Sequence, residues 1–329
     1  MKASIIVCTR DRADSIVETF EALAALEPTG SEIVVVDTST GKEKEKTFQL
    51  SQRCGARYVH EPRSGLSLAR NTGIANATGD VIAFTDDDCI PAKDWLAHKL
   101  RVLSDPTVWA CTGRVVQHSE AGACNLFEEV AGQDLGGEKR EFTRENLEFG
   151  LGMFFSNVVK IFDKHMKARA PGPWSIGHGS SMAFRREVFD KLGRFDERLG
   201  GGAPLKSCDD TEMFYRVLKS GHRIIYEPAA VVRHKHGLDN ADVFKTRYGY
   251  SFGGAAFMWE YKRDPLMFVM FGGRLLQLTL KTAQYKLLGK KDLAASFSSD
   301  LRGFLDGWST WRKLAKAAGS PAGKSTPQT

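Results

Sequence analysis

The sequence predicts an α/β fold in which helices cover a mostly parallel sheet, followed by a helical C-terminal region. Short runs rich in β-branched residues alternate with segments of helical periodicity in the first part of the chain. This is the pattern of a parallel sheet with crossover helices. Three consecutive aspartates, Asp86–Asp88, directly follow the apolar run Val81–Thr85. Because open α/β sheets bind ligands at the carboxyl ends of their strands, this acidic turn is the first candidate site.

Strands and helices are expected to alternate before the acidic turn. The expected strands are short apolar runs: Ser4–Cys8, Ile33–Val36, Tyr58–His60 and Val81–Thr85. The expected helices have helical periodicity or helix-favouring composition: Ile16–Ala24, Gly41–Gln52 and Ser64–Ala77. Ser15 and Glu18 have the spacing of a capping box for the first of these helices. Gly73 is expected to interrupt the third.

A second organised region follows a less regular stretch over residues 119–173. The glycines of Gly177-His178-Gly179 permit close approach of the backbone to a ligand. Beyond them we expect a strand at Met182–Phe184, a helical turn at Glu187–Leu192, a helix that begins near Asp209 and ends before Gly221, and a strand at Ile224–Tyr226.

Two acidic groups and one histidine are the chemical candidates. Neighbouring carboxylates repel one another unless a cation neutralises them, and at Asp86–Asp88 the cation of choice is Mg²⁺ or Mn²⁺. A solvated acidic turn is the alternative. Asp209, Asp210 and Glu212 cluster at a predicted helix N-terminus, where helix capping is the simpler explanation, although three acids exceed what capping needs. His234 is either a metal ligand or an ordinary histidine near a strand end.

Composition and motifs exclude several classes of protein. The hydrophobic content of 42% and charged content of 26% are ordinary for a globular chain. No signal peptide or membrane-spanning run is expected, so a cytoplasmic location is the default. The six cysteines are scattered and form no CxxC pair, which disfavours a zinc site or a disulfide framework. GxGxxG and GxxxxGK[ST] are absent, so neither a dinucleotide site nor a P-loop is indicated.

Taken together, the motifs resemble those of family 2 glycosyltransferases with the GT-A fold. The segments that carry the resemblance stand in the family's order over residues 3–236: Ser4–Arg12, Val34–Asp37, Ala69–Gly73, Phe84–Asp88, Gly177–Arg186, Gly193–Glu197, and Cys208–Asp210 with Arg216. Phe84–Asp88 matches the DXD motif. Each segment alone is a weak signal, but their joint order and spacing is specific.

The resemblance implies an enzyme that moves a sugar from a nucleoside diphosphate to an acceptor hydroxyl, with inversion and with Mn²⁺ or Mg²⁺. A UDP-sugar is the expected donor. A saccharide, in a lipid-linked or growing bacterial surface polysaccharide or glycolipid, is the expected acceptor. The family's metal-binding positions correspond to Asp88 and His234, and its catalytic positions to Asp210, the base, and Asp209. The nucleotide- and donor-binding positions correspond to Thr9, Arg12, Asp37, Arg70, Asp86 and Asp87.

The chain departs from the family's pattern at two positions. Many relatives carry Asn where this chain has Ser181, and Gly is usual where it has Cys208. These departures leave the donor sugar and the acceptor geometry open. A catalytically silent member that binds nucleotide or scaffolds a partner enzyme is the alternative function. A nucleotidyltransferase is a third, although Thr9–Arg12 stands where its glycine-rich loop would be.

The expected domains are a catalytic domain over residues 1–238, with a nucleotide-binding half (1–118) and an acceptor-binding half (119–238), and a basic, aromatic-rich helical region over 239–329. Residues 240–329 contain 14 Lys or Arg and 6 Asp or Glu, whereas residues 1–239 contain 32 and 34.

The excess of basic residues suggests that the C-terminal region lies on the anionic cytoplasmic face of the inner membrane, which would make the protein a peripheral membrane protein. Packing on the catalytic domain or a dimer contact are the alternatives. Nucleic acid is not an expected partner, because no recognised binding motif accompanies the charge. Gly249, Gly253 and Gly254 are expected to divide the region into separate helices, and residues 317–329 to be disordered.

Overall fold

The computed structural model describes residues 1–118, 134–148, 173–235 and 240–317, which belong to two compact units. The first, here called the sheet unit, comprises residues 1–144, 176–197 and 209–237. The second, the helical unit, comprises residues 145–175, 198–208 and 238–329. The predicted domain limit at residue 238, most of the irregular stretch 119–173 and the tail 318–329 lie outside the described residues.

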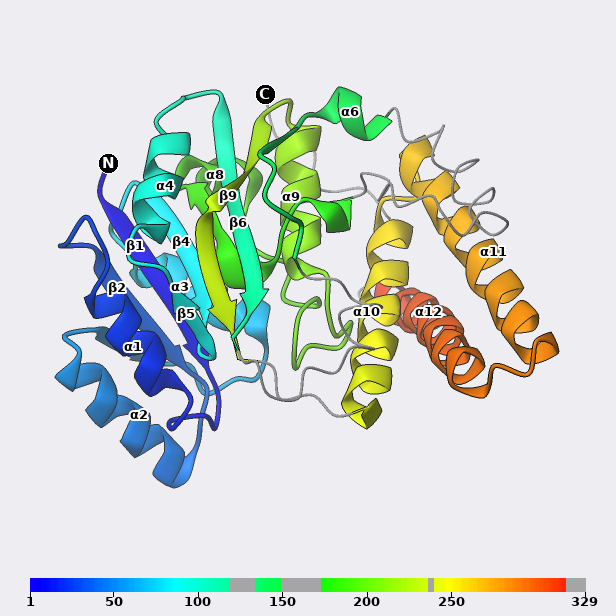
Figure 1. Cartoon of the computed structure of the whole chain (residues 1–329), viewed down its shortest axis with the longest axis horizontal. Helices are drawn as coiled ribbons and strands as arrows, with labels where there is room; N and C mark the ends of the chain where they lie inside the picture. Colours follow the sequence, from blue (N-terminus) through cyan, green and yellow to red (C-terminus); the bar gives the residue numbers. More distant parts are fainter. Residues whose placement is uncertain (119–133, 149–172, 236–239, 318–329) are drawn as a thin grey trace. The chain divides into compact units, whose positions relative to one another are not determined.

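The sheet unit is built on a mixed, mostly parallel sheet (Figure 1). In hydrogen-bonding order its strands are β3 (Arg57–His60), β2 (Glu32–Asp37), β1 (Ala3–Thr9), β4 (Val81–Asp86), β8 (Met182–Arg185), β6 (Val108–Gln117), β9 (Arg223–His234) and β5 (Cys89–Pro91), and β7 (Arg140–Phe142) also pairs with β9. Antiparallel β8 joins the parallel group β1–β4 to the parallel pair β6 and β9. β1, β2, β3, β4, β6 and β9 therefore all run in one direction, and the predicted fold class is confirmed.

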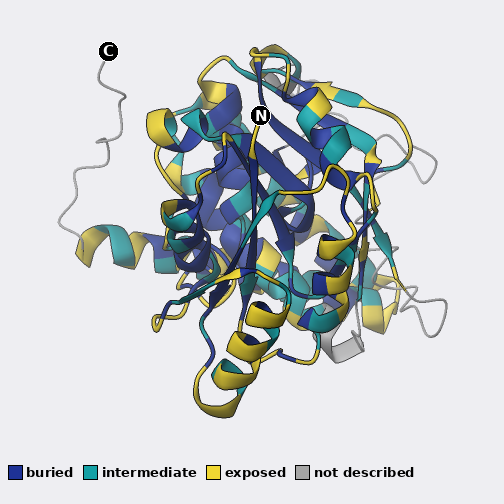
Figure 2. Ribbon diagram, turned by 90° about the vertical axis from the view of Figure 1, so that its left-hand side faces the viewer, coloured by how far each residue is buried: buried dark blue, intermediate teal, exposed yellow. Residues whose placement is uncertain are grey.

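Helices alternate with the strands of the sheet unit. They are α1 (Ile16–Ala24), α2 (Gly41–Arg53), α3 (Leu66–Asn76), α4 (Trp95–Val102), α8 (Glu187–Leu192) and α9 (Asp209–Lys219), with the 3-10 turn η2 (Gly179–Ser181). The 3-10 turn η1 (Pro173–Ser175) and all but the first residue of the short α6 (Arg144–Glu148) belong to the helical unit. The apolar core packs Ile5 and Val81 of the sheet against Phe20 of α1 and Trp95 of α4. Figure 2 shows the central strands as the most buried part of the chain.

Two predictions about the helices are wrong. Ser15 has helical backbone angles (φ −69°, ψ −35°) rather than the extended ones of an N-cap, and its side chain caps no amide. Its own N–H donates to the Arg12 carbonyl at 3.0 Å, so a turn already precedes it. Gly73 does not interrupt α3, which runs through it unbroken. A Cβ at Gly73 would lie 2.5 Å from Cγ2 of Ile6, so this glycine permits α3 to pack closely on β1.

The last strand is longer than the sequence predicts. β9 continues from Ile224–Tyr226 through Glu227-Pro228 to His234. Its pairing with β6 shifts register between Gly113 and Arg114, and such an irregularity is where a strand tolerates proline. As a result His234 is the last residue of a strand. β5, α4 and β6 were not among the predicted elements.

The helical unit contains α10 (Asn240–Glu260), α11 (Pro265–Leu287) and α12 (Lys291–Ala317). The prediction that Gly249, Gly253 and Gly254 separate helices is wrong, because α10 runs through all three. A Cβ at Gly253 would lie 2.2 Å from the Ser207 hydroxyl, so this glycine serves close packing within the unit. None of the described helices is long and apolar enough to cross a bilayer.

Candidate active site at the carboxyl edge of the sheet

The strand ends bring the predicted site residues to one edge of the sheet. The register aligns Thr9 with Asp37, and Asp86 with the residue that precedes Thr9 in β1. At the end of β9, His234 pairs with Cys89 of β5, and Cys89 directly follows the three aspartates. Residues far apart in the sequence therefore meet because β1, β2, β4 and β9 all end at this edge.

Asp87 points into the protein rather than toward solvent. It is 5% exposed, and its Oδ2 accepts a hydrogen bond from the Thr9 hydroxyl at 2.6 Å. The Thr19 hydroxyl donates to its backbone carbonyl at 3.0 Å. Burial raises the pKa of Asp87 to about 6, although the Thr9 bond opposes the rise. Arg12 Nη1 lies 3.3 Å from Asp87 Oδ1 and 3.0 Å from Asp88 Oδ2, so the guanidinium joins two of the aspartates.

Asp88 instead faces His234, and the two belong to a cluster suited to a metal. His234 Nε2 lies 2.9 Å from Asp88 Oδ1. Burial disfavours the imidazolium, but the hydrogen bond to Asp88 and the nearby negative charges outweigh this and raise the pKa of His234. One ligand atom each from Asp86, Asp88, Cys89 and His234 lie within 4.8 Å of one another. Carboxylates suit Mg²⁺ or Mn²⁺, and an imidazole is a common ligand of first-row transition metals, so the donor set fits a divalent cation.

Arg70 connects the two acidic groups that the sequence singled out. Its side chain is 3% exposed and comes from α3. It forms an ion pair with Asp209 and lies 3.6 Å from Asp86 Oδ1. The rings of Phe84 and Phe195 flank its guanidinium at 5.9 Å and 5.7 Å. A buried cation between two carboxylates offsets their mutual repulsion, so Arg70 holds the acidic turn and the start of α9 together.

Asp209 and Asp210, the first residues of α9, have different surroundings. Asp209 is 5% exposed, and burial raises its pKa to about 6 despite the charge of Arg70. Asp210 is only partly buried. Its Oδ2 accepts from the Gly179 amide at 2.8 Å, and its Oδ1 accepts from the Thr211 amide at 2.6 Å. Asp209 is thus neutralised in the interior, whereas Asp210 is an oriented carboxylate that solvent reaches.

Asp37 accepts hydrogen bonds from a residue just beyond β2 and from a residue of β3. It is fully buried, with Oδ1 accepting from the Ser39 amide at 2.8 Å and Oδ2 accepting from the Tyr58 hydroxyl at 2.9 Å. Burial, followed by these contacts with Asp37, raises the pKa of Tyr58. Asp37 stays at the end of β2, and neither of these two hydrogen bonds joins it to the three aspartates.

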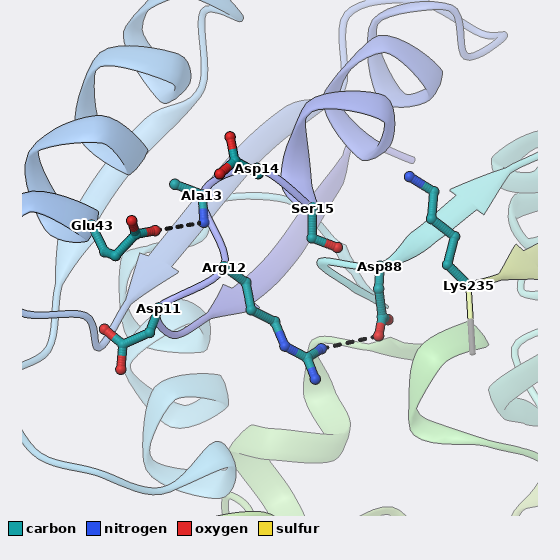
Figure 3. Close-up of a pocket in the computed structure, with 8 residues that line it drawn as sticks. All are labelled: Asp11, Arg12, Ala13, Asp14, Ser15, Glu43, Asp88 and Lys235. Carbon is teal, nitrogen blue, oxygen red and sulfur yellow. Dashed lines mark hydrogen bonds and ion pairs between the residues drawn. The ribbon is translucent and has the colours of Figure 1, made fainter. Parts of the chain in front are cut away.

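A pocket of about 390 Å³ opens beside this edge (Figure 3). It is lined by Asp11, Arg12, Ala13, Asp14, Ser15, Glu43, Asp88 and Lys235. In Figure 3 the Arg12 guanidinium reaches toward Asp88, and Glu43 accepts a hydrogen bond from the Ala13 amide at 3.2 Å. Lys235, paired with Glu18 at 2.7 Å, adds a second cation to the pocket wall.

Several residues of the site were not among the predicted ones. Cys89 and Lys235 flank predicted residues in the sequence, and that adjacency was the available signal. The glycines 177 and 179 were expected to approach a ligand, but they approach the protein instead. A Cβ at Gly179 would lie 2.6 Å from Arg70 Nη2, and one at Gly177 would lie 2.4 Å from Thr112. Arg216, which helped to align the motif, donates to the Leu192 carbonyl at 2.7 Å.

Several proteins of similar sequence are described as glycosyltransferases. The chain is 28% identical over 250 residues to the pre-mycofactocin glycosyltransferase of Mycobacterium tuberculosis. The aligned region covers 75% of this chain and 46% of that protein. It is 26% identical over 242 residues to the glucosyl-dolichyl phosphate glucuronosyltransferase of Haloferax volcanii. This aligned region covers 71% of this chain and 69% of that protein. The chain thus spans about half the length of the first of these relatives.

Two solved structures share the fold. The mannosyltransferase of Pyrobaculum calidifontis in complex with GDP-Man and Mn²⁺ has a TM-score of 0.57 and 20% identity over 97% of this chain and 79% of that one. Residues 1–349 of Staphylococcus aureus TarS have a TM-score of 0.51 and 13% identity, and the match covers 95% of this chain and 92% of that one. The predicted GT-A fold is confirmed. The family model described as glycosyl transferase family 2 matches residues 4–193, more than half of the chain, so the chain belongs to glycosyl transferase family 2.

Proposed function

We propose that the protein is an inverting, metal-assisted glycosyltransferase that moves a sugar from a nucleoside diphosphate to an acceptor hydroxyl. The observation that carries the proposal is the buried Arg70, which joins Asp86 of the acidic turn to Asp209 of α9. This contact supports the proposal that a cation-binding group and an oriented carboxylate, Asp210, act in one site. Direct displacement needs both, one for the leaving group and one for the nucleophile.

The leaving group of such a reaction is a nucleoside diphosphate, which needs positive charge around it. Asp88 and His234, with Asp86 beside them, would hold the divalent cation. When bound, a Mg²⁺ or Mn²⁺ ion acts as a Lewis acid that stabilises the departing diphosphate. Arg12 and Lys235, which line the same pocket as Asp88, add cationic groups that attract a diphosphate.

Asp210 is the proposed base. The acceptor oxygen attacks the anomeric carbon as the bond to the diphosphate oxygen breaks, and the hydroxyl proton passes to Asp210. The transition state has oxocarbenium character, so most of the proton transfer can come late and a carboxylate suffices. Asp210 lies in the first turn of α9, where backbone N–H groups point toward a carboxylate. The ion pair of Asp209 with Arg70 supports a positioning role for Asp209 rather than that of base.

The nucleoside is assigned to the ends of β1 and β2. Asp37 would read the base ring, with Thr9 beside it and Asp86 nearest the ribose and donor sugar. A UDP-sugar is the proposed donor, although the structurally similar mannosyltransferase carries GDP-Man. Asp37 must exchange its hydrogen bond from Tyr58 or Ser39 to contact a base, and this local rearrangement is part of the proposal.

The proposed acceptor is a lipid-linked or growing saccharide of a bacterial surface polysaccharide or glycolipid. One relative is described as acting on a glucosyl-dolichyl phosphate, which is a lipid-linked sugar. Association of the basic C-terminal region with an anionic membrane surface, on the cytoplasmic face, would bring the site near such an acceptor. A catalytically silent, nucleotide-binding or scaffolding protein is the second candidate, and the presence of both acidic groups, Asp86–Asp88 and Asp209–Asp210, disfavours it.

Thermal unfolding with UDP, GDP, dTDP and CMP, each with and without Mn²⁺, tests the proposal. A cognate diphosphate at about 100 times its Kd should stabilise the protein by about 2.7 kcal/mol, and only with the metal. Asp88→Asn should lose this response. Asp94→Asn is the matched control, because Asp94 is an exposed aspartate paired with His98 at 3.2 Å outside the site.

Asp210→Asn separates binding from chemistry. It should keep the nucleotide-dependent stabilisation and lose release of the diphosphate from the cognate donor. If no nucleotide stabilises the wild-type chain, or if Asp88→Asn responds as strongly as wild type, the transferase assignment is wrong. Normal stabilisation without any donor turnover would instead support the silent, nucleotide-binding alternative.

A further inference from the structure

The outer face of α11 is uncharged along almost the whole helix. It is formed by Phe268, Gly272, Leu276, Thr279, Leu280, Ala283 and Leu287, all of which are exposed. At about 100° per residue these positions fall within an arc of about 120°. An exposed helix face of a globular protein ordinarily carries charged and polar residues, so this face is unusual.

The opposite face of the same helix supplies the packing contacts. Met267, Phe271 and Leu278 are buried there, and Phe271 meets Phe304 of α12 with ring centroids 4.8 Å apart. α11 packs on α12 and α10 among the described elements (Figure 1). The apolar outer residues are therefore additional to the residues that hold the helical unit together.

The two charges in the middle of α11 both lie away from the outer face. Arg274 points to the bundle, where its Nη2 lies 3.7 Å from Asp300 Oδ2 of α12. Lys281 is partly buried, 5.5 Å from the Tyr285 ring. From Pro265 to Tyr285 no other charged residue occurs, so nothing on the outer face opposes contact with an apolar phase.

Exposed apolar side chains concentrate on this helix. Ten large apolar side chains are exposed among the described residues, and five of them are in the segment 268–288. Leu287 is 88% exposed, Phe268 58% and Leu276 42%. A cluster of this kind marks an interaction surface, whereas scattered exposed apolar residues need no explanation.

Basic residues flank both ends of the outer face. Lys262 and Arg263 precede α11, Lys286 lies in its last turn, and Lys290 and Lys291 follow it, against Asp264 and Asp292. The wider region from 240 to 329 carries 14 Lys or Arg and 6 Asp or Glu. Apolar residues on one face with basic residues at the ends match a bilayer interface, where acyl chains lie beside anionic headgroups. A second copy of this basic region would instead add charge repulsion.

We propose that the outer face of α11 docks onto an anionic lipid surface, with the helix axis in the plane of the interface. Phe268, Leu276 and Leu287 enter the boundary between headgroups and acyl chains, and the basic ends contact the headgroups. The helix lies on the bilayer rather than crossing it, in keeping with the absence of a spanning helix among the described residues. This inference rests on the membrane association proposed above and assigns the surface that makes it.

Vesicle flotation of the full chain tests the assignment. Wild type should float with vesicles of phosphatidylcholine and phosphatidylglycerol, float less with phosphatidylcholine alone, and dissociate as salt is raised. Leu276→Glu should lower the partition coefficient at least about tenfold. Leu305→Glu is the matched control, because Leu305 of α12 is 41% exposed, almost the same as Leu276, and should leave binding within about twofold.

Two further measurements keep the test decisive. Hydrogen–deuterium exchange on the wild-type chain should show added protection at residues 265–288 when anionic vesicles are present, whatever the fate of the variants. Wild type that does not float with anionic vesicles, Leu276→Glu that binds like wild type, or a wild-type dimer that Leu276→Glu converts to monomer would each overturn the proposal. Leu276→Glu should keep the response to nucleotide and Mn²⁺, so a failure here is distinguishable from a failure of the proposed function.

Discussion

A buried lysine beneath the site yields a quantitative prediction. Lys99 of α4 is fully buried, and its Nζ donates to the Ser181 carbonyl at 3.1 Å and lies 5.2 Å from the Trp95 ring centroid. Ser181 ends the turn η2, whose Gly179 amide holds Asp210. No ion pair to Lys99 is found in the described part of the chain. Lys99 is therefore a cation that the fold buries with neutral partners.

Burial lowers the pKa of Lys99 from 10.5 to about 8. Each unit of difference between the pKa values of the folded and unfolded states corresponds to about 1.36 kcal/mol. Keeping the buried lysine charged therefore lowers the stability of the folded state by about 3 kcal/mol. Below pH 8 both states bind the proton and the full cost applies. Between pH 8 and 10.5 the unfolded chain binds more protons than the folded chain, so the stability of the folded state rises with pH. Above pH 10.5 the cost has vanished.

Urea unfolding of wild type and Lys99→Met, across the range from about pH 7.5 to about 10.5, measures this cost. The free energy of unfolding of wild type minus that of the variant should rise by about 3 kcal/mol across the range. Groups that titrate there without interacting with Lys99, such as Tyr58, are common to both proteins and cancel in the difference. Lys93→Met, at a lysine whose side chain is 66% exposed, is the control. A constant difference for Lys99→Met, or an equal slope for Lys93→Met, would refute the reasoning.

Two other substitutions test the internal architecture of the site by urea unfolding. Arg70→Met should destabilise the protein by about 3 kcal/mol, because it leaves buried Asp209 without its cation, whereas Arg63→Met, at an arginine 67% exposed, should cost less than about 1 kcal/mol. Equal effects of the two would contradict the role given to Arg70. Cys208 has φ +67°, so Cys208→Gly should stabilise by about 1 kcal/mol by removing strain. Cys208→Ala retains the strain, and an equal gain from it would assign the effect to the thiol instead.

The strand ends were predictable because their signal is local. An apolar run such as Val81–Thr85 followed by aspartates indicates a buried strand and its end without reference to any other part of the chain. Parallel strands then share an edge, so the positions of Thr9, Asp37 and Asp86 at three strand ends were enough to expect them near one another. β9 was harder to predict, because Glu227-Pro228 reads as a break, and the register shift that accommodates it appears only when β9 pairs with β6.

Glycine is the residue type that the sequence alone described least well. Its spacing suggested breaks at Gly73 and in α10, and a ligand contact at Gly179. Three of these glycines instead admit a neighbour: Ile6 at Gly73, Ser207 at Gly253 and Arg70 at Gly179. The missing Cβ looks the same in the sequence whether the chain needs a turn or a close approach, and only the packed neighbour distinguishes the two.

The sequence by itself determined the fold class, the edge of the sheet that carries the site and the two acidic groups, because each depends on periodicity and residue type within a short segment. Only the tertiary structure decided that Asp87 turns inward to Thr9 while Asp88 faces His234, and that Arg70 neutralises Asp209 and leaves Asp210 accessible. Adjacent carboxylates are chemically identical in a sequence. Their difference arises from burial and from charges on other elements, which exist only once the chain has folded.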